Sequence, residues 1–332
     1  MVRPAAPAGS QPAPSVQGPR VQGPRGPRRC QTRRVPRVSA VHVLRCGRVR
    51  VRPQNLQRGR SPELWWTATS RRWSAWLPVN VVLVVHEEGV LLFDTGQSPR
   101  SLAEPDYYPG RRTGGLLGAV VGWAFRRQAQ FEVPPTDTLV SRLAEVGLSP
   151  ADVDTVVLSH LHQDHAGNLD VVPGARVLLA PEELALLSEP HPELHGVLPG
   201  AVVPHDADLQ PLSWSALPSP LGPGGPGEDP AFTAGHDLYG DGTLVALPTP
   251  GHSPGSVSLL VRRPDGPPLL LVGDLTYDCD RLERGALPGT GDAATQEASS
   301  RAVLRLRESE PGLVVVPAHD ATATTGLDLK KS

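Results

Sequence analysis

Three histidines and one aspartate lie within six consecutive positions, in the order His160-Leu161-His162-Gln163-Asp164-His165. They follow the apolar residues 153–158, which predict a buried strand that ends in a polar loop. Imidazole nitrogen and carboxylate oxygen bind divalent metals such as zinc but add little to a packed core. The order can supply two ions, one through His160 and His162 and the other through Asp164 and His165. Two adjacent ions suit hydrolysis, because a water held between them loses a proton near neutral pH.

Three more polar residues follow apolar runs in the same way. His252 lies in the turn Thr-Pro-Gly-His-Ser-Pro-Gly, shortly after the apolar residues 244–247. Asp274 follows the four apolar residues 269–272 after one glycine, and His319 follows the four apolar residues 313–316 after Pro317 and Ala318. One such residue is commonly a cap or a turn, but four strand ends that all offer imidazole or carboxylate are hard to explain in that way. Because loops at strand ends often carry function, the pattern indicates one metal site assembled from distant parts of the chain.

The elements that must position these residues can be predicted from hydrophobic patterning. Strands are expected at residues 38–51, 79–85, 90–93, 153–158, 175–180, 244–247, 256–261, 269–272 and 313–316, and helices at residues 136–146, from Pro181 onward and at residues 295–306. In the first helix, Leu139, Val140, Leu143 and Ala144 are expected on one side. Residues 211–230, rich in Pro, Gly and Ser, are expected to form a loop. Strands come first as hairpins and later alternate with helices, which predicts an α+β sandwich of sheets flanked by helices.

Composition separates the chain into two parts. Residues 1–37 are rich in Pro, Arg and Gly and repeat Val-Gln-Gly-Pro-Arg, so they are expected to be disordered, while residues 38–332 are expected to form the catalytic domain. Fourteen arginines and no acidic residue fall in residues 1–60. A basic arm can bind nucleic acid, but this one has no aromatic residue to stack on bases, so a solvated tail without a nucleic-acid partner is the preferred interpretation.

The remaining sequence features bear on location. The 3 cysteines are scattered and form no disulfide framework, and no secretory signal is recognisable, so a cytoplasmic protein is expected. No apolar run approaches the roughly 18–20 residues of a membrane span.

The His-x-His-x-Asp-His run, the turn around His252, Asp274 and His319 together resemble the metallo-β-lactamase superfamily, from about residue 38 to the end of the chain. The resemblance implies a four-layer αβ/βα sandwich. It also implies that His160, His162 and His252 bind one ion, that Asp164, His165 and His319 bind a second, and that Asp274 bridges them. Di-iron members usually have Glu where this chain has His162, which favours two zinc ions per chain.

Within this superfamily the chain is most similar to the N-acyl-homoserine lactonase group. The supporting segments are Phe93-Asp94-Thr95-Gly96, the turn around His252 and Asp274-Leu275-Thr276-Tyr277. True β-lactamases lack the carboxylate that Asp274 supplies, ribonuclease-type members usually carry an insertion or an RNA-binding arm, and glyoxalase II-type thioesterases add a helical extension, whereas only 13 residues follow His319. Ser256 departs from the family, which often has a second, non-ligand histidine there.

The resemblance implies a mechanism in which a metal-bridging hydroxide opens the ring of a lactone. Tyr277 would donate a hydrogen bond to the developing oxyanion, and Asp164 or a bound water would return the proton to the leaving oxygen. Two other functions stay open. One is hydrolysis of a thioester or another carboxylic ester, as in glyoxalase II, and the other is a non-catalytic metal-binding or partner-binding protein.

Several residues outside the ligand set allow two interpretations. Asp94 either caps a turn or hydrogen-bonds a ligand histidine, and the apolar residues 116–125 form either a lid or a packed helix. The tryptophans could line an acyl-chain groove, although packing in the core or in a homodimer is the preferred interpretation; they are Trp65, Trp66, Trp73 and Trp76. The histidines without motif context are assigned to the surface or to packing; they are His42, His86, His191, His195, His205 and His236.

Overall fold

The computed structural model describes Met1 and residues 38–222 and 229–322. Apart from Met1, these residues belong to one compact unit, Pro36–Ser332. The expected disorder of residues 1–37 therefore lies outside the described residues.

The described strands form two sheets. The first has the order β4-β1-β2-β3-β5-β6-β7 and the second the order β13-β12-β11-β10-β9-β8. The strands of the first sheet are β1 (Val38–Val51), β2 (Leu77–His86), β3 (Gly89–Phe93), β4 (Ala129–Glu132), β5 (Thr155–Val157), β6 (Arg176–Leu179) and β7 (Asp208–Pro211). Those of the second are β8 (Ser215–Leu221), β9 (Phe232–Asp237), β10 (Leu244–Pro248), β11 (Val257–Val261), β12 (Leu269–Leu271) and β13 (Val314–Val316).

Alternating side chains bury both faces of each sheet. In β2, Val82 and Val84 join a cluster that also contains Leu244 and Ala246 of β10, so this cluster lies between the two sheets. The intervening residues of β2, such as Leu83, point into a second cluster on the opposite face. Because successive side chains of a strand point to opposite faces, each sheet needs a further layer outside it.

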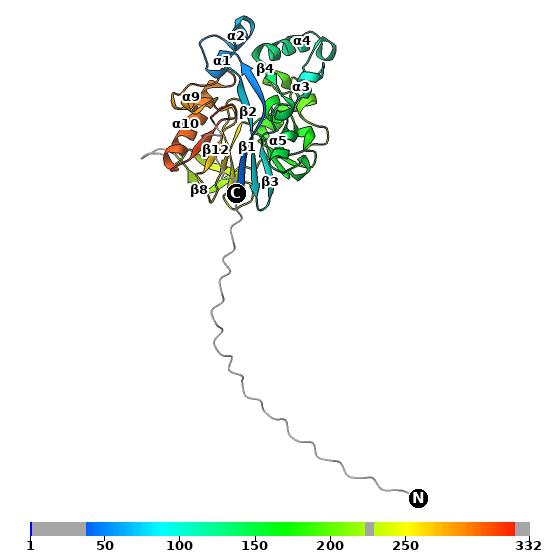
Figure 1. The fold of residues 1–332 in the computed structure, drawn as a ribbon. Coiled ribbons are helices and arrows are strands. Elements are labelled where there is room, and N and C mark those ends of the chain that lie inside the picture. The colour runs from blue at the N-terminus through cyan, green and yellow to red at the C-terminus, as the bar shows by residue number, and fades with distance from the viewer. Residues whose placement is uncertain (2–37, 223–228, 323–332) are drawn as a thin grey trace. The chain divides into compact units, whose positions relative to one another are not determined.

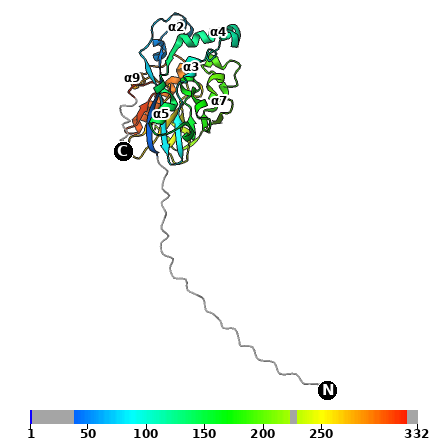
Figure 2. The same cartoon turned by 45° about the vertical axis from the view of Figure 1, so that its right-hand side comes forward.

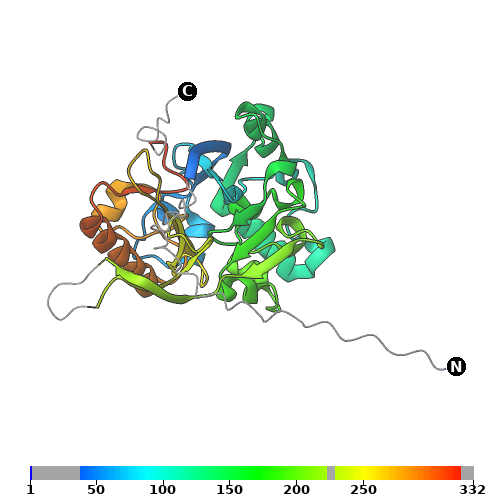
Figure 3. The ribbon, with the colours of Figure 1, turned by 90° about the horizontal axis from the view of Figure 1, so that it is seen from below.

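Helices supply these outer layers. On the first sheet the outer cluster includes Leu139 and Leu143 of α5, and on the second it includes Val303 and Leu306 of α10. Figure 1 shows α9 and α10 on one side of the strands, Figure 2 shows α7 on the other, and Figure 3 shows the arrangement from below. The helices are α1 (Pro53–Leu56), α2 (Glu63–Thr69), α3 (Arg100–Ala103), α4 (Arg111–Gln128), α5 (Leu139–Glu145), α6 (Gln163–Ala166), α7 (Pro181–Leu186), α8 (Pro199–Val202), α9 (Cys279–Glu283) and α10 (Ala293–Ser309). The predicted α+β sandwich with four layers is confirmed.

Two predictions for individual elements were wrong in part. Helix α5 begins at Leu139 and not at residue 136, because the Thr138 side chain accepts a hydrogen bond from the Ser141 backbone and ends the preceding 3-10 turn. Its buried face is narrower than expected: Leu139 and Leu143 are buried, whereas Val140 is 46% exposed. The segment expected to be a loop at residues 211–230 contains β8, an edge strand that pairs with β9 and carries two prolines.

The apolar residues 116–125 belong to α4, in which Gly114 and Gly115 depart from helical backbone angles. Of the tryptophans, Trp66 is buried and Trp65 is largely exposed on α2. No helix in the described ranges has both the length and the apolar composition to cross a bilayer.

Candidate metal centre

Parallel strand pairs bring the predicted ligands to one edge of the sandwich. Strands β3 and β5 are parallel, with Phe93 opposite Val157, so the segments that follow them start side by side. Strands β12 and β13 are parallel in the same way, which places Asp274 and His319 next to each other. A backbone hydrogen bond of 2.9 Å from Val257 N to Ser159 O joins the start of β11, just after the turn that contains His252, to the loop after β5.

The structure brings all seven predicted ligand residues together. Their side-chain ligand atoms form three overlapping groups, and within each group the atoms lie within 4.8 Å of one another. The groups are His160, His162 and His252; His160, His165 and Asp274; and Asp164, His165 and His319. His162 and Asp164 are partly exposed, and the other five are buried.

Several buried atoms that face the centre of this group make no hydrogen bond, although two of them, His165 Nε2 and Asp274 Oδ1, form an ion pair at 3.3 Å. His160 Nε2, His165 Nε2 and Asp274 Oδ1 are buried and make no hydrogen bond. A buried polar atom without a partner costs about 1–3 kcal/mol. Neutral imidazole nitrogens and a carboxylate oxygen in this arrangement are a donor set that suits zinc, so the residues present fit the metal implied by the sequence.

Main-chain carbonyls orient two of the histidine rings by accepting a hydrogen bond from one ring nitrogen of each. Nδ1 of His319 lies 2.9 Å from the carbonyl oxygen of Pro78, and Nε2 of His162 lies 3.1 Å from that of His195. Because a carbonyl only accepts, each of these nitrogens must carry a hydrogen, so in the neutral ring that binds a metal the other ring nitrogen has the free lone pair. His162 therefore offers Nδ1, whereas His319 offers Nε2. Gly196 permits the close approach, because a Cβ there would lie 2.3 Å from His162 Nε2.

Asp94 and Ser159 hold two further rings. Asp94 Oδ2 lies 2.9 Å from His165 Nδ1, and Ser159 Oγ lies 2.9 Å from His160 Nδ1. Asp94 also accepts hydrogen bonds from the Ser159 backbone (2.7 Å) and hydroxyl (2.9 Å), and it adopts a left-handed backbone conformation with φ 63°. Of the two interpretations of Asp94, hydrogen bonding to a predicted ligand histidine is confirmed.

Sequence reasoning missed most of these outer partners. Ser159 stands next to His160 and could have been found as a hydrogen-bonding neighbour in the same motif. The carbonyls of Pro78 and His195 gave no signal, because every residue has one. His195 was assigned to the surface or packing, and it is its backbone, not its ring, that contacts the centre.

The electrostatics of the group suit a cation. Burial lowers the pKa of His160 well below its usual value and that of His252 to about 3, so both rings are neutral at pH 7. Burial opposes the charged forms of His165 and His319, but the neighbouring carboxylates together outweigh it and raise both pKa values; they are Asp274 and Asp164 and, for His165, also Asp94. Burial alone would raise the pKa of Asp274. The neighbouring rings of His319 and His165 instead hold that pKa well below the usual range. The Asp274 carboxylate therefore stays charged and can bind a cation.

Tyr277 lies against the second half of the group. Its ring stacks on His319 with centroids 5.5 Å apart, and it is buried beside Val49, Val51 and Val79. Burial, with Asp274 and Asp164 nearby, raises the pKa of Tyr277 well above 10, so the hydroxyl stays protonated and can donate. This position is compatible with the role predicted from the sequence.

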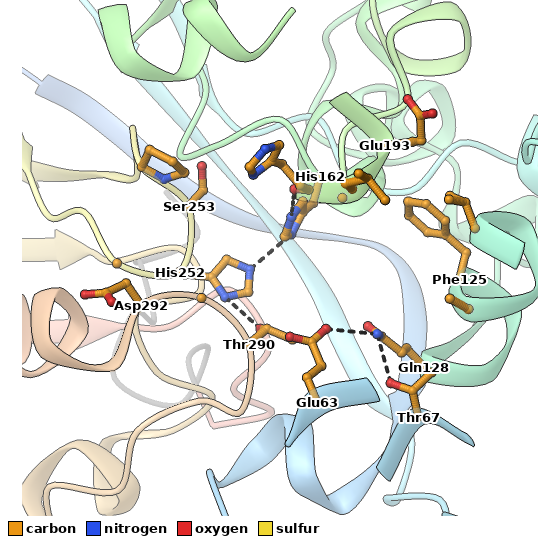
Figure 4. A pocket seen from close by; sticks show the side chains of 18 of the residues that line it. Glu63, Thr67, Phe125, Gln128, His162, Glu193, His252, Ser253, Thr290 and Asp292 are labelled. Atoms are coloured by element: carbon orange, nitrogen blue, oxygen red, sulfur yellow. Dashed lines mark hydrogen bonds between the residues drawn. The ribbon is translucent and has the colours of Figure 1, made fainter. Parts of the chain in front are cut away.

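A cavity of about 870 Å³ opens beside His162 and His252 (Figure 4). Apolar side chains such as Val121 and Phe125 of α4 line one part of it, and acidic side chains line another. Thr290 Oγ1 lies 3.3 Å from Nδ1 of His252, so the cavity wall also holds this ring. The described lining includes no lysine or arginine, and the acidic residues in it are Glu63, Glu193 and Asp292.

Comparisons with known proteins agree with this geometry. A model of the Metallo-beta-lactamase superfamily matches residues 74–319. N-acyl homoserine lactonase AttM of Rhizobium radiobacter is 33% identical over 252 residues, which cover 76% of this chain and 82% of that protein. N-acyl homoserine lactonase AiiB of Agrobacterium fabrum (strain C58) is 28% identical over 206 residues, which cover 60% of this chain and 64% of that protein.

Solved structures share the fold. An N-acyl homoserine lactone hydrolase with N-hexanoyl-L-homoserine bound at its catalytic metal centre aligns with a TM-score of 0.63 and 20% identity, covering 89% of this chain and 99% of that one. AidC, a dizinc quorum-quenching lactonase, aligns with a TM-score of 0.52 and 18% identity, covering 84% and 86%.

Proposed function

This chain belongs to the metallo-beta-lactamase superfamily, and from that premise we propose that it is a dinuclear-zinc enzyme that opens the ring of an N-acyl-homoserine lactone or a similar lactone. It is a metal-dependent hydrolase. The observation that carries the proposal is the convergence of seven ligand residues with unsatisfied atoms directed at one centre. The relatives that are 33% and 28% identical are lactonases, which supports the choice of a lactone as the substrate.

We assign the seven residues to two zinc ions. His160, His162 and His252 would hold one, and the second would be held by Asp164, His165 and His319, with Asp274 shared. When bound, the two ions supply Lewis acidity and lower the pKa of water to near neutrality. Asp94, Ser159, Thr290 and the two carbonyls keep the imidazoles oriented for this role.

The chain's own residues would handle the protons and the charge of the substrate. The hydroxyl of Tyr277 stays protonated and would donate a hydrogen bond to the oxygen on which negative charge develops. Asp164 is partly exposed and lies 3.5 Å from His319 Nε2, and we assign its carboxylate the transfer of a proton from the attacking water to the leaving ring oxygen.

The cavity supports one of the two hydrolytic functions that the sequence left open. Glutathione and coenzyme A thioesters carry carboxylates or phosphates, which the acidic groups of the lining would repel. An acyl-homoserine lactone is neutral, and its acyl chain matches the apolar part formed by α4. The charge of the cavity therefore favours a lactone over a thioester of glutathione or coenzyme A.

A substrate panel tests the proposal. Zinc-loaded protein would be assayed on acyl-homoserine lactones of several chain lengths, on glutathione and coenzyme A thioesters with the same acyl groups, and on phosphoesters. We expect kcat/KM for the lactones to exceed that for the matched thioesters by at least 100-fold. The variant His165→Ala is the control and should lose both zinc and activity. Equal or faster turnover of the thioesters would contradict the assignment of a lactone substrate.

A further inference from the structure

Glu183 is the second acidic residue of the first turn of α7, and its side chain is fully buried, with an exposed fraction of 0%. An acidic residue in a first helical turn is ordinarily explained by its favourable interaction with the helix dipole, at the surface. Its neighbour Glu182 fits that explanation, because it is exposed. Glu183 points the other way, into the molecule, and a buried carboxylate is costly unless hydrogen bonds compensate its charge.

Three hydrogen bonds compensate the carboxylate, and they come from two separate segments. Oε1 accepts from the backbone N–H of Leu161 at 2.8 Å, and Leu161 stands between His160 and His162. Oε2 accepts from the hydroxyl of Ser253, the residue after His252, and from the backbone N–H of Gly255 at 3.1 Å. One side chain therefore connects the two loops that carry the ligands of one predicted zinc ion.

The backbone of Glu183 also packs closely against the turn that contains Ser253. A Cβ at Gly255 would lie 2.3 Å from the backbone nitrogen of Glu183 and 2.5 Å from its Cβ, so only glycine fits there. This explains the last glycine of the turn Thr-Pro-Gly-His-Ser-Pro-Gly. Within the pocket view, Ser253 lies beside His252 in this turn (Figure 4). The contact fixes the turn against α7, and the carboxylate fixes the loop after β5 against the turn.

We propose that Glu183 is a positioning residue for the zinc site formed by His160, His162 and His252. Its carboxylate sets the distance between the peptide at Leu161 and the turn at Ser253. It thereby sets the separation of His162 Nδ1 and His252 Nε2, which is 3.0 Å. The inference rests on the zinc-site part of the proposed function and does not depend on the substrate.

The test is the isosteric variant Glu183→Gln. Whichever way the amide is oriented, its NH2 group faces the N–H of either Leu161 or Gly255, and two donors cannot bond each other. Zinc affinity would be measured by competition with a chromophoric chelator, and the site geometry by the visible absorption spectrum of the cobalt-substituted protein. We expect at least one zinc ion to bind about 10- to 100-fold more weakly and the cobalt spectrum to change. The matched control Glu182→Gln should keep the wild-type values.

A purely structural role predicts a different result. If Glu183→Gln lowers only the melting temperature and keeps wild-type zinc affinity and cobalt spectrum, the proposal is wrong. If this variant does not fold, Ser253→Ala removes one of the three bonds without burying a new donor. In that variant we expect a weaker but measurable loss of zinc affinity with a shifted cobalt spectrum, and wild-type values for both would overturn the proposal. These readouts need no substrate, so they remain decisive even if the protein does not hydrolyse lactones.

Discussion

Replacement of Asp94 by asparagine should weaken zinc binding while leaving the fold intact. Asparagine has the same shape and tolerates the left-handed backbone at φ 63°, so the turn after β3 should form normally. The amide oxygen can still accept from the Ser159 backbone, but the NH2 group replaces the oxygen that lies 2.9 Å from His165 Nδ1. His165 then loses the acceptor that orients its ring.

The magnitude follows from the bond lost at His165, because the Ser159 hydroxyl, which donates to the same oxygen, can rotate and accept from the amide instead. Leaving a buried donor unmatched costs about 1–3 kcal/mol, which corresponds to roughly 5- to 150-fold in the zinc dissociation constant. Asp94→Ala should cost the same in affinity and, in addition, about 1–2 kcal/mol of stability from left-handed backbone strain.

Chelator competition and metal analysis after gel filtration would measure the loss of affinity. The matched control is Asp237→Asn, because the Asp237 carboxylate accepts backbone hydrogen bonds from Gly240 and Gly242 in a turn outside the ligand groups. It should change the melting temperature without changing zinc affinity. Wild-type zinc affinity in Asp94→Asn would refute the role of Asp94 in orienting His165.

Three further predictions address catalysis, packing and metal dependence. Tyr277→Phe should lower kcat on the order of 100-fold with unchanged zinc content, and unchanged kinetics would exclude its role as an oxyanion donor. Gly255→Ala should destabilise the protein by about 1–3 kcal/mol and release zinc, because the new methyl group meets the backbone of Glu183; Gly174→Ala, where a Cβ meets nothing within 4 Å, should show neither effect. Dialysis against a chelator should abolish hydrolysis and added zinc should restore it, so activity that survives complete zinc removal would contradict a metal-dependent reaction.

The strands and the ligand set could be predicted because their signals are local. Short runs of Val and Leu such as residues 269–272 identify buried strands, and polar residues directly after them stand out. The parallel pairing of β12 with β13 then places Asp274 near His319, as the resemblance implied. In α5, by contrast, periodicity alone put Val140 on the buried face, although the sheet covers only the stripe of Leu139 and Leu143.

What could not be predicted depends on contacts between distant segments. The outer partners of His162 and His319 are main-chain carbonyls, which carry no residue signature. In the sequence, Glu183 is one of two adjacent acids after Pro181, a pattern typical of a first helical turn at the surface. Only the docking of α7 against the turn at Gly255 shows that its side chain points inward. The cavity is formed by α2, α4, the first turn of α10 and several connecting segments, whose arrangement is a property of the whole fold.

A crystal structure of the zinc-loaded protein with anomalous scattering at the zinc edge tests the central claim most directly. We predict two anomalous peaks, one bonded to His160, His162 and His252 and the other to Asp164, His165 and His319, with Asp274 in contact with both. A single peak, or zinc bound away from these side chains, would contradict the assignment of a dinuclear hydrolytic centre.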